Sequence, residues 1–494
     1  MEEKRKWDYD VAVIGAGVCG AAIARVLSGF RLKVAVLEKD TDVANGTSKA
    51  NSGIVHAGYD PLPGTKMAKY NVEGNAILHQ LTKELDIPFR ETGSLVVAFS
   101  EEEKRTLEEL LERGRQNGVP GLQLLTAEET WEKEPNLSRE ITGALYAPTA
   151  GVISPWELAI AQLEVAVTNG VELFLETEVQ AISQTDGGFV LQTVQRGTPR
   201  RFTAAAVVNA AGVYSDLVCA MVSGPSFRII PNKGQYYLLD KNQGGLVRHV
   251  VFQCPNRNGK GVLVSPTVHG NLIVGPDAVP GEDRDDVSTS AGQLAFVRRV
   301  ASKTCGQIDF RQSIRNFAGV RAQGTVDEFV IGPVPESDRF INVANIKSPG
   351  LTSSPAIALD VAEMLQRAGI AMEKKENAVT TRRVVRFKEL SAEEKNEWIR
   401  RDPRYGRVIC RCETVTEGEI AAAIHSPVPA RTVDAVKRRC GAGMGRCQGG
   451  FCSPRVVEMI ARELQIPATE VEQDKKGSVI LTGHTAKGTD GEKQ

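Results

Sequence analysis

The 494-residue sequence has few aromatic residues, few histidines and no long apolar run. Its longest apolar stretches, residues 11–17 and 204–212, are far shorter than the ~20 residues of a membrane-spanning helix. The 60 Lys plus Arg nearly balance 61 Asp plus Glu, so no strong field attracts nucleic acid or an anionic membrane. The charged amino terminus is unlike a secretory signal peptide. We therefore expect a cytoplasmic protein that would reach the inner face of a membrane only through a partner.

Cysteine, by contrast, is concentrated in one region. Of the nine cysteines, five lie between Cys410 and Cys452, and the others are scattered over the rest of the chain. A chain without an export signal keeps its thiols reduced, so a disulfide framework is not expected. Clustered thiols in such a protein are typical of a metal centre.

The amino-terminal residues alternate strand, glycine turn, helix and strand. Val11–Ile14 and Lys33–Leu37 are apolar runs typical of buried parallel strands, and Gly20–Leu27 between them has helical composition. Residues 15–20 read Gly-Ala-Gly-Val-Cys-Gly, a GxGxxG at the turn from strand to helix. Glycines at this turn let the backbone approach a pyrophosphate, which would sit at the positive end of the helix. Glu38 ends the second strand, where a carboxylate can accept hydrogen bonds from an adenosine ribose.

Later segments predict helices, followed by a β-rich region. The helical patterns cover 71–86, 101–117, 155–170 and about 354–368. Between about 226 and 345, short β-rich runs separated by Gly, Pro and Asn suggest a mostly antiparallel sheet. Residues 371–405 are charged and have no strand period, so we expect a linker there. The residues after about 473 have no periodicity and suggest a loose tail.

Two segments indicate where a flat ring would lie. Ala204–Val208 is an apolar run followed by Asn-Ala-Ala-Gly, and small residues at a strand end let the backbone approach a bulky planar group. Residues 348–354 read Ser-Pro-Gly-Leu-Thr-Ser-Ser and open the later helix. Backbone amides at such a helix start could face the pyrimidine end of a flavin and stabilise negative charge on its reduced ring.

Residues 47–58 read Thr-Ser-Lys-Ala-Asn-Ser-Gly-Ile-Val-His-Ala-Gly. Across about residues 8–370 the chain resembles the D-amino-acid-oxidase-like superfamily of flavoproteins. This segment is similar to the flavin-ring loop of its glycerol-3-phosphate and L-2-hydroxyglutarate dehydrogenases. The Asn-Ala-Ala-Gly segment with Tyr214, Ser215 and Asp216 is also typical of that superfamily. The resemblance implies FAD. The cofactor contacts expected from motif and resemblance are Gly15, Gly17, Gly20, Glu38, Lys39, Thr47, Ser48, Asn51, Ser52, Val179, Ala211, Gly212, Gly350, Leu351, Thr352 and Ser353.

Oxidation by such a flavoprotein needs a group that takes the hydroxyl proton and cations that hold an anionic substrate. The resemblance places His56 beside the flavin ring, the alternative being a structural histidine bonded within its loop. Arg315 and Arg321 lie in a segment resembling the one in which the family keeps its substrate arginines. Six residues apart on a strand they would share a face, which suits one anion, although Arg315 could equally be a surface charge. Lys347 matches a lysine that some glycerol-3-phosphate dehydrogenases keep near flavin and substrate, whereas Lys233 is interpreted as a strand-edge charge.

The carboxyl-terminal cysteines form a Cys410-Arg-Cys412 motif and a Cys447-x-x-x-x-Cys452 motif. Four thiolates complete either a tetrahedral zinc site or a 2Fe-2S cluster. Structural zinc sites prefer CxxC spacing, so these motifs favour the larger binuclear cluster, with one motif per iron. Residues 406–468 resemble the bacterioferritin-associated-ferredoxin-like 2Fe-2S domain. Cys440 is expected to be a free thiol.

These expectations combine into one fold class. It is an α/β Rossmann-type FAD-binding domain with an inserted, mostly antiparallel β substrate domain, plus a small helical 2Fe-2S domain. The expected boundaries are 8–370 for the oxidoreductase (FAD-binding parts about 8–90, 150–225 and 325–370; substrate parts about 91–149 and 226–324), 371–405 for the linker, 406–468 for the 2Fe-2S domain and 469–494 for a flexible tail.

A flavin that takes two electrons and a cluster that passes them singly imply a dehydrogenase rather than an oxidase. The resemblance is nearest to glycerol-3-phosphate dehydrogenases of the anaerobic type, which implies oxidation of sn-glycerol 3-phosphate to dihydroxyacetone phosphate. L-2-Hydroxyglutarate oxidation is the alternative, since arginines bind phosphate or carboxylate. A second alternative is an electron-transfer subunit without substrate chemistry of its own. The expected acceptor is a partner flavoprotein or a quinone-linked membrane subunit.

Overall fold

A computed structural model describes residues 6–255 and 261–483, which form two compact units. The first unit runs to Lys39 and again over Val43–Arg383, and the second contains Asp40–Asp42 and the chain from Val384 onward. Among the described residues, no helix is long and apolar enough to cross a membrane.

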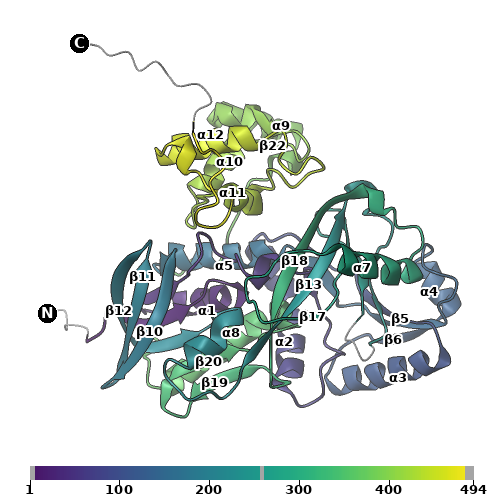
Figure 1. The fold of residues 1–494 in the computed structure, drawn as a ribbon, viewed down its shortest axis with the longest axis horizontal. Coiled ribbons are helices and arrows are strands. Elements are labelled where there is room, and N and C mark those ends of the chain that lie inside the picture. The colour runs from purple at the N-terminus through teal and green to yellow at the C-terminus, as the bar shows by residue number, and fades with distance from the viewer. Residues whose placement is uncertain (1–5, 256–260, 484–494) are drawn as a thin grey trace. The chain divides into compact units, whose positions relative to one another are not determined.

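The first sheet of the first unit is built around parallel strands. Its order is β10-β11-β12-β1-β2-β9, with β20 beside β12 and β19 beside β20. Figure 1 labels β10, β11, β12, β19 and β20 of this sheet. The strands are β1 (Tyr9–Ile14), β2 (Val34–Leu37), β9 (Glu172–Phe174), β10 (Thr177–Thr185), β11 (Gly188–Gln195), β12 (Thr198–Asn209), β19 (Val330–Val334) and β20 (Ser337–Ala344). Val11 pairs in parallel with Val34 of β2 and Ala206 of β12. These central strands are buried, as the continuous apolar runs predict.

Four helices pack around this sheet. They are α1 (Val18–Ser28), α2 (Lys66–Glu84), α5 (Pro155–Thr168) and α8 (Gly350–Arg367). Helix α1 contacts both α5 and α8, and α2 contacts α8. Small residues allow the closest approach: a Cβ added at Gly74 of α2 would lie 2.1 Å from the carbonyl oxygen of Thr352 in α8. The α2–α8 contact therefore requires glycine at this position.

The second sheet has nine strands and is antiparallel except where β14 pairs with β5. Its strands are β5 (Ser94–Ala98), β6 (Gln123–Thr126), β7 (Gly143–Ala147), β13 (Ile229–Leu239), β14 (Val250–Gln253), β15 (Leu263–Pro266), β16 (Leu272–Gly275), β17 (Val279–Pro280) and β18 (Ser313–Gly324). Two apolar clusters use alternate residues of these strands: Val96 belongs to one, Leu95 and Val97 to the other. The predicted α/β class with an inserted, mostly antiparallel sheet is confirmed.

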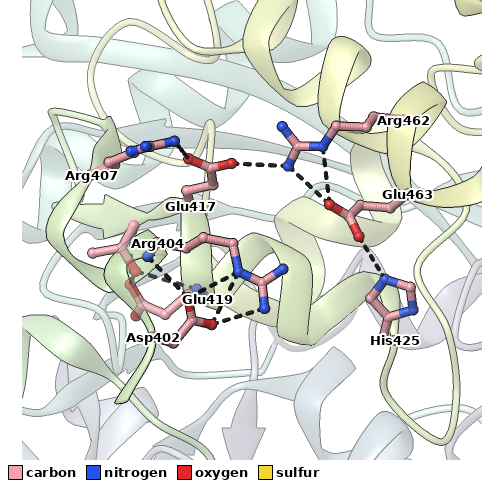
Figure 2. Close-up of polar contacts among 9 residues, drawn as sticks. Asp402, Arg404, Arg407, Glu417, Glu419, His425, Arg462 and Glu463 are labelled. Carbon is pink, nitrogen blue, oxygen red and sulfur yellow. Dashed lines mark hydrogen bonds and ion pairs between the residues drawn. The ribbon is translucent and has the colours of Figure 1, made fainter. Parts of the chain in front are cut away.

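The second unit is a small helical domain with its own core. Helices α10 (Glu417–Ile424), α11 (Val433–Cys440) and α12 (Ser453–Leu464) enclose that core together with β21 (Val408–Cys410) and β22 (Val415–Thr416). Figure 2 shows an ion-pair chain on this unit, in which the carboxylate of Glu417 lies between Arg407 at 3.3 Å and Arg462 at 2.9 Å. Arg462 also bonds Glu463, whose other oxygen lies 2.8 Å from Nε2 of His425.

Asp40–Asp42 groups with the second unit because of a buried ion pair. The Asp42 carboxylate, with 1% of its side chain exposed, accepts hydrogen bonds from Arg438 at 2.7 Å and from Arg439 at 2.8 Å, both in α11. Burial alone would raise the pKa of Asp42, but Arg439 and Arg438 outweigh it and lower that pKa to about 2.

The expected linker and tail differ from the structure. Within residues 371–405, the part up to Arg383 belongs to the first unit, and the Arg31 N–H donates to the Glu373 carbonyl at 2.7 Å. From Val384 onward the chain belongs to the second unit, where Phe387 is buried and α9 (Ala392–Arg401) forms. Because this segment has few buried apolar residues, its sequence resembles that of a linker. In the structure, ion pairs and backbone hydrogen bonds hold it in place.

The expected tail begins with fixed contacts. Val471 is fully buried, and the N–H of Val433 donates to the Glu472 carbonyl at 3.1 Å. The prediction of a flexible tail is therefore wrong for these first residues, because one buried valine and backbone hydrogen bonds attach them. Its last part, 484–494, lies outside the described residues.

Candidate active site and cluster site

The candidate active site lies where four parallel strands end. Strands β1, β2, β12 and β20 point the same way, so their carboxyl ends meet at one edge of the sheet. The residues that follow them are Gly15, Glu38, Ala210 and Asn345. In open α/β sheets, ligands bind in the crevice outside this edge.

The glycine loop after β1 has no room for a side chain at Gly15 or at Gly20. Gly15 has φ +100°, and an added Cβ would lie 2.5 Å from the Ala210 carbonyl oxygen. A Cβ added at Gly20 would lie 1.9 Å from the Gly15 carbonyl oxygen. Gly17 caps α1 without a side-chain hydrogen bond, and Ser48 Oγ accepts the Val18 N–H at 2.9 Å. This close turn at a helix start suits a pyrophosphate.

The residues after β2 and the neighbouring loop complete this end of the site. Glu38 Oε2 accepts the Ala16 N–H at 2.8 Å, which fixes its carboxylate beside the glycine loop. The Lys39 Nζ lies 3.7 Å from the centre of the Tyr214 ring. Asn45 is buried, and its side-chain nitrogen has no hydrogen-bond partner in the described protein. A buried orphan donor in this loop fits a polar ligand, and no sequence pattern had marked it.

The loop that resembles the flavin-ring loop is held by its own side chains and by β18. Asn51 Nδ2 donates to the carbonyls of Thr47 and Ser48, both at 3.0 Å, while its Oδ1 accepts the Gly53 N–H at 2.8 Å. Thr47 Oγ1 donates to the Val320 carbonyl at 2.5 Å. A close approach supports the same contact, since a Cβ added at Gly319 would lie 1.9 Å from the Ala50 carbonyl oxygen.

The other expected cofactor residues occupy four places in the first unit. Ser52 is half-buried in the loop just described, and Val179 is buried in β10 at an irregularity of the strand pairing. Ala211 and Gly212 follow β12, where Gly212 has φ +57°. The fourth group, Gly350, Leu351, Thr352 and Ser353, forms the first turn of α8, so this helix begins four residues earlier than expected. Because its N-cap Pro349 gives no side-chain hydrogen bond, the helix start suits the electron-rich end of a flavin.

His56 is fixed by its backbone on both sides. Its N–H donates to Thr352 Oγ1 at 2.9 Å, and its carbonyl accepts from Asn71 at 2.8 Å and Asn75 at 3.1 Å. The ring stacks on Phe252 with the centroids 5.9 Å apart.

The Nε2 atom of His56 lies 3.2 Å from Oγ of Ser348, just before α8. The imidazole is thus oriented by two residues, Ser348 and Phe252, that the analysis of the sequence did not assign. Ser348 is the first residue of the Ser-Pro-Gly-Leu-Thr-Ser-Ser segment, and its place in that segment could have marked it. No sequence pattern marked Phe252.

The two arginines of β18 have different environments. Arg321 Nη1 donates to Asn232 Oδ1 at 2.8 Å, and Nη2 donates to the Asp277 carbonyl at 2.9 Å. Arg321 directly follows Val320, whose carbonyl accepts a hydrogen bond from Thr47 in the loop of residues 47–58. Arg315 is exposed and lies six positions away, which is about 20 Å along a strand. The expectation that both arginines bind one anion is therefore wrong, because strand periodicity sets the face but not the distance.

The two lysines are engaged by carboxylates. Lys347 forms an ion pair with Asp327, and 18% of its side chain is exposed. Lys233 Nζ lies 2.5 Å from Asp286 and 3.3 Å from Ser288 Oγ. Lys347 directly precedes Ser348, the residue that contacts His56, whereas Lys233 is far from Ser348 in the sequence.

The four cysteines of the second unit come together as two close pairs, each with one member from each motif. Cys412 Sγ and Cys447 Sγ lie 3.6 Å apart, and both residues are exposed. Cys410 and Cys452 are buried and hydrogen-bonded to each other. Within the part of the chain described, no three His, Cys, Asp or Glu side chains are close enough to hold a single metal ion.

The buried pair is tuned by backbone and thiol donors. The hydrogen bond from Cys452 lowers the pKa of Cys410 to about 6, although burial opposes it. The same hydrogen bond raises the pKa of Cys452. The N–H of Gly443 points at Cys410 Sγ at 3.5 Å, as expected for a glycine loop around a sulfur site. The thiol of the fifth cysteine, Cys440, bonds the Val436 carbonyl at 3.3 Å inside its own helix.

The model of FAD dependent oxidoreductases matches residues 10–364. The chain belongs to this family. Residues 408–462 match the BFD-like [2Fe-2S] binding domain, so FAD and a 2Fe-2S cluster are its cofactors. Three features fit FAD: the glycine loop, the uncapped start of α8 and the side-chain nitrogen of Asn45 that has no hydrogen-bond partner in the described protein. The two thiol pairs fit the 2Fe-2S cluster.

Named relatives span both units or only the first. A glycerol 3-phosphate dehydrogenase of Caloramator mitchellensis is 52% identical over 97% of this chain and 99% of that protein. An L-2-hydroxyglutarate dehydrogenase of Indibacter alkaliphilus is 31% identical over 72% of this chain and 98% of that protein. Among solved structures, a dithionite-reduced L-alpha-glycerophosphate oxidase from Mycoplasma pneumoniae with FAD bound has a TM-score of 0.72 at 33% identity, covering 76% of this chain and 98% of its own.

Proposed function

We propose that this protein is a dehydrogenase that oxidises sn-glycerol 3-phosphate to dihydroxyacetone phosphate and passes the electrons through its 2Fe-2S cluster to a partner acceptor. The observation that carries the proposal is the 52% identity to a glycerol 3-phosphate dehydrogenase over 97% of the chain, cluster domain included. The relative called an oxidase matches only 76% of the chain. An enzyme that hands electrons directly to oxygen needs no one-electron relay, which favours the dehydrogenase.

His56 is the proposed base of this reaction. The bound FAD supplies the hydride acceptor. Nε2 of His56, hydrogen-bonded to Ser348 Oγ at 3.2 Å, takes the proton of the substrate hydroxyl as the adjacent C–H bond breaks. Three hydrogen bonds fix the backbone of His56, and stacking on Phe252 supports its ring.

Arg321 is the proposed binding group for the substrate phosphate. Two of its nitrogens are already held by Asn232 and by the Asp277 carbonyl, so the guanidinium plane is fixed before substrate arrives. A guanidinium has five N–H donors, and those left over can form paired hydrogen bonds with phosphate oxygens. Lys347, which precedes Ser348, would have to leave its ion pair with Asp327 to contribute to phosphate binding.

Steady-state assays with an artificial dye acceptor test the proposal. Glycerol 3-phosphate should be oxidised with kcat/KM at least ~100-fold above that for L-2-hydroxyglutarate, because the site must bind a phosphate rather than a carboxylate. L-2-Hydroxyglutarate oxidation is the second candidate, on the strength of the 31% identical relative. A preference for that substrate would replace the first proposal, and activity on neither would remove both.

Two further observations separate the dehydrogenase from other flavoproteins. Anaerobic mixing with glycerol 3-phosphate should bleach the flavin absorption, which an electron-transfer subunit without substrate chemistry would not do. Peroxide formed in air in a 1:1 ratio to product, without any added acceptor, would instead identify an oxidase.

A further inference from the structure

The cluster site has an inner and an outer side. Cys410 and Cys452 are each 1% exposed and belong to the apolar core of the second unit, whereas Cys412 and Cys447 are exposed. The site is therefore set at the surface of the second unit, with one thiol pair facing the core and the other facing solvent.

The spacing of the thiols indicates how they divide between two irons. Two thiolates on one tetrahedral metal with metal–sulfur bonds of about 2.3 Å lie about 3.7 Å apart. The 3.6 Å between Cys412 Sγ and Cys447 Sγ matches this value, although the two residues come from different motifs. The remaining pair, Cys410 and Cys452, is hydrogen-bonded in the same way. This spacing favours a division in which each motif gives one thiol to each iron, as an alternative to the expected one motif per iron.

The rim around the outer pair is positively charged and carries one exposed aromatic ring. Phe451 is 55% exposed, and the Arg411 guanidinium lies 4.6 Å from the centre of its ring. The exposed ionisable side chains, cysteines aside, in the ligand segments 410–412 and 446–455 are all arginines: Arg411, Arg446 and Arg455; the exposed Glu458 follows one turn later in α12. The nearest following carboxylate, that of Glu413, is buried and lies 3.7 Å from Lys388 Nζ.

We propose that this exit face, composed of Arg411, Cys412, Arg446, Cys447, Phe451 and Arg455, docks an acidic one-electron carrier protein, and that the electron leaves through the iron held by Cys412 and Cys447. This deepens the proposed function, which requires a partner acceptor. In the step, the cluster loses one electron and the carrier gains one, and no bond or proton moves. A desolvated aromatic ring inside a charged rim is a common anchor of protein interfaces, and opposite charge speeds the encounter.

The docking test uses the full-length holoprotein and does not depend on glycerol 3-phosphate. Photoreduced flavodoxin, a strongly acidic carrier, is mixed with oxidised holoprotein at several ionic strengths, and cluster reduction is followed by freeze-quench EPR. The reverse direction of transfer uses the same contact. The bimolecular rate constant should fall at least ~10-fold between low and high salt.

Variants identify the face. Arg455→Glu should lower the low-salt rate constant at least ~10-fold and flatten its salt dependence, and Phe451→Ala should lower it with the salt dependence retained. Arg431→Glu makes the same charge change at an exposed position outside both ligand segments, so it should stay within about 2-fold of wild type. Iron and flavin contents should be equal in all four proteins.

Three results would overturn the docking proposal. They are a rate constant that rises with salt, equal losses in Arg455→Glu and Arg431→Glu, and efficient cluster oxidation only by quinone-containing membrane vesicles. The last would indicate a membrane subunit as the partner. Failure of the substrate assay would leave this test unaffected, because no substrate is used.

Ligand pairing has its own test, with Mössbauer spectra of iron-enriched Cys→Ser variants. Cys412→Ser and Cys447→Ser should alter the same one of the two iron sites, and Cys410→Ser the other, because each serine changes the ligand of one iron. If Cys410→Ser and Cys412→Ser altered the same site, the pairing would be overturned.

If a variant loses its iron, the pairing is tested on the full chain without its cluster. Mild oxidation of that protein forms disulfides, and their identity shows which thiols lie together. A Cys412–Cys447 bond supports the pairing, and a Cys410–Cys412 bond contradicts it.

Discussion

At the scale of single residues, the orientation of His56 rests on contacts that leave Nε2 beside a hydroxyl. The backbone hydrogen bonds to Thr352, Asn71 and Asn75 fix the main chain, and Phe252 supports the ring.

We expect His56→Asn to lower kcat for glycerol 3-phosphate by ~10²–10⁴-fold with little change in flavin content, because proton removal is lost while the backbone contacts remain. Steady-state dye assays and the anaerobic rate of flavin bleaching measure this. His79→Gln is the matched control, since His79 pairs with Glu91 away from the motif loop. Loss of flavin together with activity would identify His56 as a structural residue instead.

The two arginines of β18 make a second contrast at this scale. Arg321→Lys keeps the charge but loses the paired donors held by Asn232 and Asp277, so KM for glycerol 3-phosphate should rise ~10–100-fold. Arg315→Lys should leave KM within about 2-fold, because Arg315 is exposed and far along the strand. The KM values of the two variants are measured in one assay series. Equal effects on KM would contradict the assignment of Arg321 as the phosphate-binding residue.

At the scale of elements, the turn between β1 and α1 excludes a side chain at Gly15. Gly15→Ala places a Cβ 2.5 Å from the Ala210 carbonyl at φ +100°, so flavin content should fall at least ~10-fold. Gly46→Ala is the control, because its added Cβ meets nothing within 4 Å and its φ is −91°. The FAD-to-protein ratio after purification, read from absorbance, is the measurement. Wild-type flavin content in Gly15→Ala would disprove the close backbone approach.

Helix α11 depends on one buried carboxylate. Asp42→Asn should destabilise the second unit by roughly 3–5 kcal/mol, because Arg439 would remain buried without its counter-charge and Arg438 would keep only Asp474 at 3.1 Å. The folded pKa of about 2 lies below the ordinary value, so the ionised Asp42 stabilises the fold above pH ~4 and this contribution is lost as the pH falls through 2.

Urea unfolding of the cluster-free protein between pH 7 and pH 2, followed by far-ultraviolet circular dichroism, checks this. Glu470→Gln, at an exposed position of the same unit, should change neither the midpoint nor its pH dependence. An Asp42→Asn protein as stable as wild type at pH 7 would show that the pair contributes nothing.

At the scale of the whole molecule, two units with separate cores carry two cofactors. Apolar clusters of the first unit share no residue with that of the second. Metal ligation contributes directly to the stability of a small domain, whereas the flavin stabilises only the unit that binds it.

Removing iron with a chelator under reducing conditions should therefore lower one of two calorimetric transitions and leave FAD bound. Proteolysis should then cut first after Val384. A single transition that moves as a whole would show that the units unfold together.

The sequence by itself determined the features that local chemistry specifies. The GxGxxG at residues 15–20, the apolar strands around it and the two cysteine motifs each fall within a short segment, because tight turns, buried strands and thiolate ligands restrict which residues fit. The fold class and both cofactors followed from these segments and from the resemblance they carry.

Only the tertiary structure decided what joins distant segments. Ser348 reaches His56 across 292 positions, and Cys412 meets Cys447 across 35, so neither pairing is encoded in a local pattern. The same holds for the distance that separates Arg315 from the site and for the attachment of the expected linker and tail. Periodicity reports which face a side chain occupies, whereas its partner depends on how the chain folds back on itself.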